Sequence, residues 1–365
     1  MIKIKKGLNI PIVGQPSSVV EKGVSVRSVG VTGPDCVGMK PTMFVKEGDL
    51  VQTGQPLFEC KKNEGVVFTA PASGKVSRIK RGERRAFQTL EISVSEDNPV
   101  DFNHYQKKSP EAYSSEEVRA LLAESGMWSC IRQRPFDRNP SVKEKAHSLF
   151  ISTLDTNPLA MDPQLVISER NKFFQAGLQV LSTLPEKNVY LCSKTKETEL
   201  PKLKNLKVHE FSGVHPAGNV GTHIHFLQPV SAQKTVWHIG YQDVIAVGHL
   251  FLTGRLDSER WVAIGGPRAK NPRILKTRVG ANLKELMVHE VVEPENTRVI
   301  SGSILNGRVQ DDDFLFLGRF HNQVSCIEED RKREFLGWHS PGFDRFSQKR
   351  IYFSRLRFGH KFSLG

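Results

Sequence analysis

The sequence predicts a multidomain protein of the α/β-plus-β class, and three observations support this prediction. Short apolar segments alternate with amphipathic helical patterns between residues 149 and 256, which is typical of a sheet flanked by helices. Residues 42–94 consist of short strands separated by turns that contain Gly and Pro, which is typical of a small β module. The chain has 365 residues and is therefore longer than one average domain.

The α/β pattern is clearest where two apolar runs, Val208–Phe211 and Thr235–Ile239, flank a loop rich in Gly, His and Pro. Apolar residues then recur near the spacing i, i+3, i+4, i+7 up to Gly254, which predicts a buried helix and its end. We therefore expect an open, largely parallel sheet. The other expected elements are strands at Leu149–Leu154, Leu165–Ile167 and Val189–Cys192, and helices from Ser114 or Ser115 to Gly126 and over Phe173–Ser182.

The β module at residues 42–94 resembles the barrel-sandwich fold of biotinyl and lipoyl carriers. In those carriers a lysine on a tight hairpin bears the cofactor, usually beside Met or Ala. The matching hairpin here, Cys60–Gly65, lacks these neighbours and is one residue longer. Lys62 is therefore expected to be a solvated lysine, and the module to be a docking scaffold with Val31–Met43 beside it.

Beyond the α/β region, strands at Val262–Ile264 and Arg273–Thr277 are followed by a short helix with Asn282 as its N-cap. This order suggests a β-grasp unit, which Val299–Leu305 completes. Later strands are expected at Phe314–Phe320, Gln323–Ile327 and Glu334–Trp338. The predicted units are a barrel-sandwich module at 1–105, an α/β domain at 106–256, a β-grasp module at 257–310, and a strand-rich basic segment at 311–365.

Charge and composition limit the function classes. The formal net charge is +13, and nine Lys and Arg residues lie between Arg331 and Lys361 against Glu334 and Asp344. Such a surface suits solubility alone, docking beside a membrane, or nucleic acid, although no nucleic-acid module is recognisable. The five cysteines are scattered without a CxxC pair, which argues against zinc and iron–sulfur sites. Neither a secretory signal nor an apolar run of about 18 residues occurs, so we expect a cytoplasmic location or the cytoplasmic face of a membrane.

Five segments carry a resemblance to a known family. They read KIKKGLNIPIVGQP, VGMKPTMFVKEGD, SGMWSCIRQRPF, HPAGNVGTHIHFLQPVS and YQDVIAVGHLFLTG. They closely resemble the NqrA family of the sodium-translocating NADH:quinone oxidoreductases, which is related to RnfC and to the flavin-carrying, NADH-oxidising subunit of complex I. The resemblance covers nearly all of the chain.

The resemblance implies both a fold and a role. The α/β domain would be Rossmann-like, the β-grasp module would be of the soluble-ligand-binding type, and a helical C-terminal region would follow residue 365. The complex passes electrons from NADH through flavins and an iron–sulfur centre to ubiquinone and exports sodium. This chain would be a peripheral subunit on the cytoplasmic face with no redox centre of its own. It would dock on the membrane subunits, NqrB first among them, and contribute to the quinone-reduction step.

The segment Gly126–Phe136 is aromatic and basic, whereas the relatives place a glycine-rich flavin loop there. Bulky side chains would obstruct close approach of a phosphate to the backbone. The loop Asp155–Leu159 also lacks the glutamate of their nucleotide loop, so we expect neither FMN nor NADH on this chain. The residues that could instead contact quinone, form a subunit interface or serve only structure are Trp128, Arg132, Arg134 and Phe136, with Val37 and Met39.

The loop that leaves the strand Val208–Phe211 is placed where open sheets bind ligands and partners. We expect His215, Pro216, His223 and His225 to face a partner there. His223 and His225 would share one face of a strand, but a metal site would need Asp243 or His215 as well, so we assign no metal. Two rival hypotheses remain, a basic nucleic-acid-binding module and an RnfC-like electron-transfer subunit.

Overall fold

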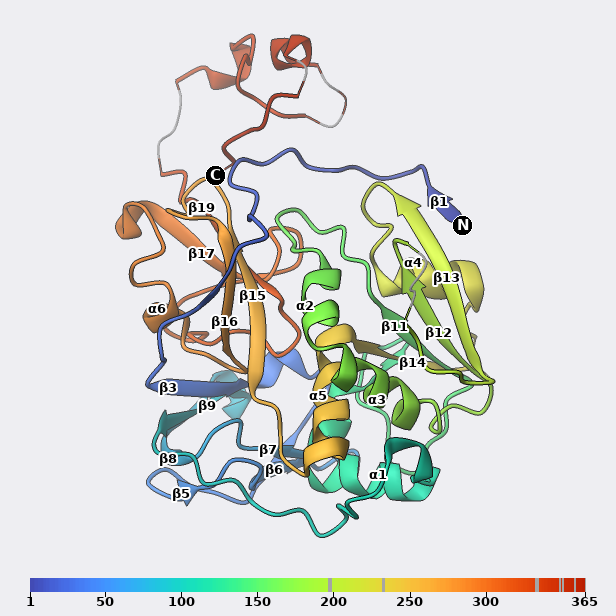
Figure 1. The fold of residues 1–365 in the computed structure, drawn as a ribbon. Coiled ribbons are helices and arrows are strands. Elements are labelled where there is room, and N and C mark those ends of the chain that lie inside the picture. Colours follow the sequence, from blue (N-terminus) through green and yellow to red (C-terminus); the bar gives the residue numbers. More distant parts are fainter. Residues whose placement is uncertain are drawn as a thin grey trace.

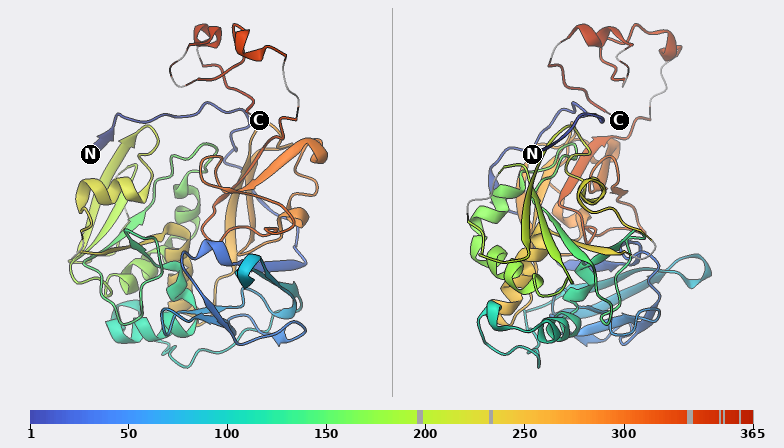
Figure 2. Two further views of the ribbon diagram at one scale, coloured as in Figure 1. Left: turned by 180° about the vertical axis from the view of Figure 1, so that it is seen from behind. Right: turned by 90° about the vertical axis from the view of Figure 1, so that its right-hand side faces the viewer.

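The computed structural model describes residues 1–365 apart from 196–198, 232–233, 332–334, 348, 350, 358 and 365. Two small sheets, a mixed six-stranded sheet and a largely parallel six-stranded sheet with its helices make up the fold (Figure 1). The described residues from 335 to 357 stand off the body in all three views (Figures 1 and 2), whereas Phe362 returns to it and pairs with Ile12. No helix among the described residues is long and apolar enough to span a membrane.

The first module contains two antiparallel sheets. Phe58 stacks on Phe68 with ring centroids 4.8 Å apart, and Leu90 and Ile92 are fully buried beside them. The strands are β3 (Ser28–Thr32), β9 (Phe87–Val94), β8 (Gly74–Arg81) and β5 (Leu50–Val51) in one sheet, and β4 (Pro41–Met43), β6 (Pro56–Cys60) and β7 (Val67–Thr69) in the other. The predicted β module is therefore present.

The α/β region forms a six-stranded sheet in the order β1-β13-β12-β11-β14-β10, in which only β10 runs antiparallel to its neighbour. Its strands are β1 (Ile2–Ile4), β13 (Leu206–Gly213), β12 (Asn188–Ser193), β11 (Ser148–Ser152), β14 (Val236–Gly240) and β10 (Arg132–Arg134). The expected open, largely parallel sheet is confirmed, whereas the Rossmann-like assignment stays a prediction.

Helices cover both faces of this sheet (Figure 1). Strand β11 alternates, because Phe150 packs with Ile224 of α4 while Leu149 and Ile151 belong to the cluster that includes α3 and α5. The helices are α1 (Ser115–Glu124), α2 (Pro163–Glu169), α3 (Asn171–Leu181), α4 (Val220–Leu227) and α5 (Tyr241–Thr253). The expected ends of two of them are confirmed: Ser114 caps α1, and Gly254, in the left-handed region at φ 73°, follows α5.

The third module is a mixed sheet in the order β18-β17-β19-β15-β16-β2. The predicted hairpin pairs β15 (Glu259–Gly265) with β16 (Arg273–Arg278), and the Asn282 side chain caps α6 (Leu283–Leu286) as expected. The remaining strands are β2 (Val20–Lys22), β17 (Thr297–Ser301), β18 (Arg308–Val309) and β19 (Gln323–Glu328). The β-grasp assignment stays a prediction.

The first 22 residues link two of these sheets. Strand β1 pairs with β13, and β2 pairs with β16. The N-terminal segment therefore lies outside the two small sheets of the first module (Figure 1). The boundary expected at residue 105 stays a prediction.

Several secondary-structure predictions were wrong. Leu165–Ile167 lies in helix α2, because Asp162 accepts from the Gln164 N–H as its cap and Pro163 occupies its first turn. The segment Phe314–Phe320 forms no extended strand, because it makes only a single bridge, from Phe316 to Asn282, and turns at its end. Of Glu334–Trp338, Glu334 lies outside the described residues, and the rest is turn and 3-10 helix.

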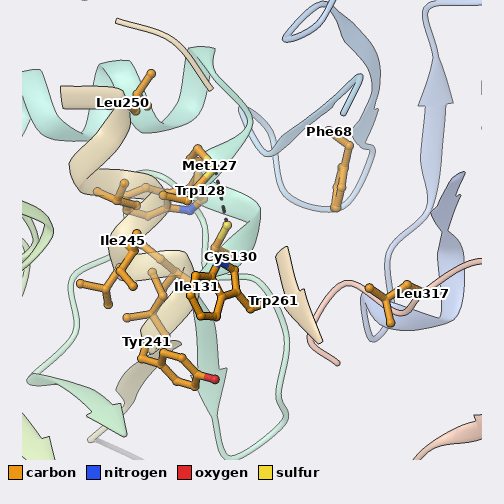
Figure 3. Packing of buried hydrophobic residues seen from close by; sticks show 14 of the residues in the cluster. Phe68, Met127, Trp128, Cys130, Ile131, Tyr241, Ile245, Leu250, Trp261 and Leu317 are labelled. Carbon is orange, nitrogen blue, oxygen red and sulfur yellow. Dashed lines mark hydrogen bonds between the residues drawn. The ribbon is translucent and has the colours of Figure 1, made fainter. Parts of the chain in front are cut away.

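The modules share one continuous hydrophobic core. Phe68 comes from the first module, Trp128 and Ile245 from the α/β domain, and Trp261 and Leu317 from the third (Figure 3). Because close-packed interiors are rigid, this shared core fixes the surfaces where the modules meet.

Candidate functional site

The segment after α1 positions the aromatic and basic residues singled out in the sequence. A 3-10 helix, Met127–Cys130, follows Gly126, and β10 then pairs with β14. Trp128 is fully buried, donates from Nε1 to the Pro140 carbonyl at 2.9 Å, and meets the Trp237 ring edge-on at 5.4 Å. Its side chain therefore belongs to the core.

Arg132 and Arg134, both half-buried, converge on one carboxylate. Arg132 Nη1 donates to Asp137 at 3.0 Å, and Arg134 Nε lies 3.4 Å from the same carboxylate. A neutral His238 with its proton on Nε2 donates to Asp137 Oδ1 at 2.8 Å. The guanidinium of Arg132 also stacks on the Phe320 ring, 4.0 Å from its centroid.

Burial and neighbouring charges set the protonation states of Asp137 and His238 in this cluster. Burial opposes the ionisation of Asp137, but the hydrogen bond from His238 and the charge of Arg132 lower the pKa of this carboxyl well below its usual range. Burial and the neighbouring Arg132 lower the pKa of His238 to about 4. At neutral pH the cluster therefore holds two cations, one carboxylate and a neutral imidazole.

Phe136 and Val37 differ from Trp128 in being exposed. Phe136 is 69% exposed and Val37 is 48% exposed. A Cβ on Gly38 would lie 3.4 Å from Nε of Arg138, so the loop that holds Val37 touches the hairpin that holds Phe136. A hollow of about 240 Å³ lies there, lined by Val37, Gly38, Met39, Cys60, Lys62, Asn63, Arg138 and Asn139. The structure thus brings Val37 and Met39 to the Phe136 hairpin.

A buried ion cluster joins the α/β domain to the third module. Asp243 of α5 accepts from Arg260 Nη2 at 2.8 Å and from Arg319 Nη1 at 2.7 Å. Burial would raise the pKa of Asp243, but Arg319 and Arg260 overcome this and lower it. Cys130 contacts Arg319, and burial raises the pKa of its thiol to about 12. Sequence reasoning missed Arg260 and Arg319, since no local pattern links residues so far apart.

Two further hollows bear on the cofactors of the related proteins. A largely apolar cavity of about 90 Å³ lies between the modules, beside Gly126, Met127 and Ser129. The Asp155 loop lines a second hollow, of about 290 Å³, at the carboxyl ends of β11 and β13. Ligand sites commonly measure about 300–1,000 Å³. The cavity beside Gly126, Met127 and Ser129 is therefore well below this range.

The histidine-rich loop divides into buried and exposed residues. His215 and Pro216 are half-buried, and the His215 carbonyl accepts from the Leu8 N–H of the N-terminal segment at 2.9 Å. His223 is fully buried, with Nε2 2.7 Å from the Ala217 carbonyl, and burial lowers its pKa to about 4. His225 is exposed. Of the four histidine-loop residues, His223 thus turns its side chain into the core.

The expected strand geometry of His223 and His225 is corrected, because both lie in helix α4, where residues two apart point in different directions. Asp243, a possible third metal ligand, is bound by arginines instead. Within the described part of the chain, no group of three His, Cys, Asp or Glu residues could hold a metal ion.

Three family models match the chain. They describe the NqrA N-terminal barrel-sandwich hybrid domain at residues 2–95, the NqrA second alpha/beta domain at 113–256 and the NQRA C-terminal domain at 261–311. The barrel-sandwich and α/β parts of the predicted fold are thereby confirmed. A crystal structure of an NAD+-reducing [NiFe]-hydrogenase in the H2-reduced state gives a TM-score of 0.42 at 9% identity, covering 63% of this chain and 52% of that chain, which supports no functional argument.

Curated relatives extend the match over nearly the whole chain. The A subunit of the Na(+)-translocating NADH-quinone reductase from Haemophilus influenzae Rd is 49% identical over 364 residues, covering 98% of this chain and 81% of the relative. The protein of the same name from Neisseria gonorrhoeae NCCP11945 is 48% identical over 362 residues, covering 99% of this chain and 79% of the relative. The chain therefore belongs to the NqrA family, whose members are the A subunits of the Na(+)-translocating NADH-quinone reductases.

Proposed function

We propose that this chain is a peripheral subunit of a sodium-translocating NADH:ubiquinone reductase on the cytoplasmic face of a bacterial membrane. It docks on the membrane subunits, with NqrB as the first candidate, and contributes to the quinone-reduction step without a redox centre of its own. The observation that carries the proposal is the identity of 48–49% to NqrA proteins over nearly the whole chain.

The exposed residues of the candidate site support an interface role. The loop that holds Val37 touches the hairpin that holds Phe136, where the first module meets the α/β domain. Both apolar side chains are exposed. Exposed aromatic residues with neighbouring arginines are typical of interface hot spots. The alternative of quinone stacking on Trp128 is weaker, because this ring is enclosed by the core.

The segment around Met127 also bears on whether this chain binds a flavin. The cavity beside Met127 and Ser129 measures about 90 Å³, below the usual range of ligand sites, so the proposal places no flavin there. NADH, flavins, the iron–sulfur centre and ubiquinone would then be bound elsewhere in the complex. Neither nucleic acid nor an RnfC-like electron-transfer role gains support from the residues of the site.

Purification of the complex tests the proposal. A tagged chain, expressed with its genomic partners and extracted in mild detergent, is expected to elute with the membrane subunits in equal stoichiometry. Phe136→Ala should weaken this association about tenfold or more, as expected for loss of a hot-spot side chain. Leu50→Ala, at an exposed apolar residue of the barrel module, is the matched control. Elution of the wild-type chain free of membrane subunits, or with a bound flavin, contradicts the proposal.

A further inference from the structure

Four cations and two apolar residues form one exposed patch where the first module meets the α/β domain. These residues, which we call the junction surface, are Val37, Lys40, Lys61, Lys62, Phe136 and Arg138. All six are exposed. They come from three different loops, so the patch exists only in the folded chain.

Backbone and amide contacts hold the three loops in fixed positions. The Lys61 N–H donates to the Lys40 carbonyl at 2.7 Å. Asn63 Nδ2 donates to the Asn139 carbonyl at 2.8 Å and ties the Lys61–Lys62 hairpin to the Phe136 hairpin. The cations are therefore presented by anchored loops rather than by a free chain end.

The chain does not neutralise these four cations. Among the described residues, no carboxylate lies within ion-pair distance of Lys40, Lys61, Lys62 or Arg138. Three acidic residues lie within two positions of these cations: the half-buried Glu59, which forms no ion pair with them, and Asp137 and Glu64, which lie near other partners. Asp137 binds Arg132, Arg134 and His238, and Glu64 lies 4.0 Å from Lys143.

The junction surface is concave as well as basic. The hollow of about 240 Å³ opens between Met39, Lys62 and Arg138. It is smaller than most small-molecule sites, which measure about 300–1,000 Å³, yet large enough to admit a side chain. A flat lipid surface would leave such a hollow unfilled, whereas a protein side chain can fill it.

We propose that the junction surface binds an acidic peptide segment of a partner subunit, with one apolar side chain of that segment inserted between Met39 and Arg138. This inference rests on the proposed function and specifies the chemistry of its docking partner. The four cations meet the acidic side chains and accelerate association, while Val37 and Phe136 exclude water around the inserted side chain.

Charge reversal in the intact complex tests the inference. The variant Lys61→Glu/Lys62→Glu is compared with Lys202→Glu/Lys204→Glu, which makes the same charge change at exposed lysines before strand β13. The fraction of each chain retained on the tagged membrane subunits is measured from about 0.05 to 0.5 M NaCl. We expect the first variant to be retained at least tenfold less well at low salt, and wild-type retention to fall with salt.

The outcomes separate this inference from the proposed function. If the wild-type chain is not retained at all, the proposed function fails, and the inference fails with it. If both double variants are retained like the wild type, the inference alone is overturned.

Binding to phosphatidylglycerol vesicles provides a second arm. If Lys61→Glu/Lys62→Glu loses vesicle binding but is still retained on the membrane subunits, the proposed acidic peptide is overturned, and anionic lipid is the ligand of the junction surface. Unchanged circular dichroism of the variants shows that folding is intact.

Discussion

Positive charge occurs in two opposite environments in this molecule. In the buried ion cluster, Arg260 and Arg319 share the Asp243 carboxylate, and the side chains of Arg260 and Asp243 are only 5% and 4% exposed. At the junction surface, Lys61, Lys62 and their neighbours have no carboxylate partner among the described residues.

The difference follows from the cost of desolvation. A buried cation without a partner is expensive, so its carboxylate must come from the same chain. An exposed cation is stabilised by water and needs no internal partner, so it remains available for an external one. The buried cluster therefore links the α/β domain to the third module, and the exposed cations remain available for the partner that we propose.

The largest expected effect comes from breaking the buried cluster. Asp243→Ala leaves Arg260 and Arg319 without their carboxylate and should lower the free energy of unfolding by about 3–5 kcal/mol. Urea unfolding followed by circular dichroism measures this change. Asp312→Ala, which removes the partner of Lys284 from an exposed pair, is the control and should leave stability unchanged. Equal effects of the two variants would contradict the distinction between buried and exposed cations.

Two histidines on helix α4 sharpen the comparison through pH. Burial lowers the pKa of His223 to about 4, below the value of about 6.5 for an unfolded chain. The unfolded state therefore binds more protons between these values, and stability is lost as pH falls from about 6.5 towards 4. His223 should contribute a loss of about 2 kcal/mol between pH 7 and pH 5.

The measurement compares urea unfolding at pH 7 and pH 5 in wild type and His223→Gln. The variant keeps a donor for the Ala217 carbonyl but cannot titrate, so its loss of stability on acidification should be smaller by that amount. His225→Gln, at an exposed position of the same helix, should match the wild type. A wild-type pH dependence that survives in His223→Gln would refute the assignment.

Local signals predicted much of this fold. Ser114, Asn282 and Gly254 act at helix ends as their residue types suggest, and the alternation in the α/β region predicted the parallel sheet. The prediction failed where a short apolar run outweighed a local signal. Leu165–Ile167 follows Asp162 and Pro163, which together start a helix.

The site depended on contacts that no local pattern encodes. The resemblance pointed to Val37, Met39 and Phe136, but not to their approach to Arg138 or to the lysines of the Cys60–Gly65 hairpin. The pairing of β1 with β13 and the binding of Arg319 to Asp243 also join distant residues. Such contacts arise when whole modules pack, so a single sequence does not predict them.

A smaller effect is expected from an exposed residue that satisfies the backbone of a helix end. Ser114 lies at the surface, yet its hydroxyl accepts from the Glu117 N–H at 3.3 Å, and the Glu117 carboxylate accepts from the Ser114 N–H at 2.7 Å. Because Ser114→Ala removes a helix cap, it should cost about 1 kcal/mol in urea unfolding. Ser114→Asp restores an acceptor and should recover most of this loss. No loss in the alanine variant would mean that water replaces the cap.

The smallest stability effect is expected at the junction surface itself. Lys61→Glu/Lys62→Glu removes no internal ion pair among the described residues, so its urea unfolding curve should overlay that of the wild type. The same substitutions are expected to have a large effect on retention by the membrane subunits. A stability loss comparable to that of Asp243→Ala would show that these lysines serve the internal fold. The two regions would then no longer differ in purpose, and the case for an acidic partner would lose its physical basis.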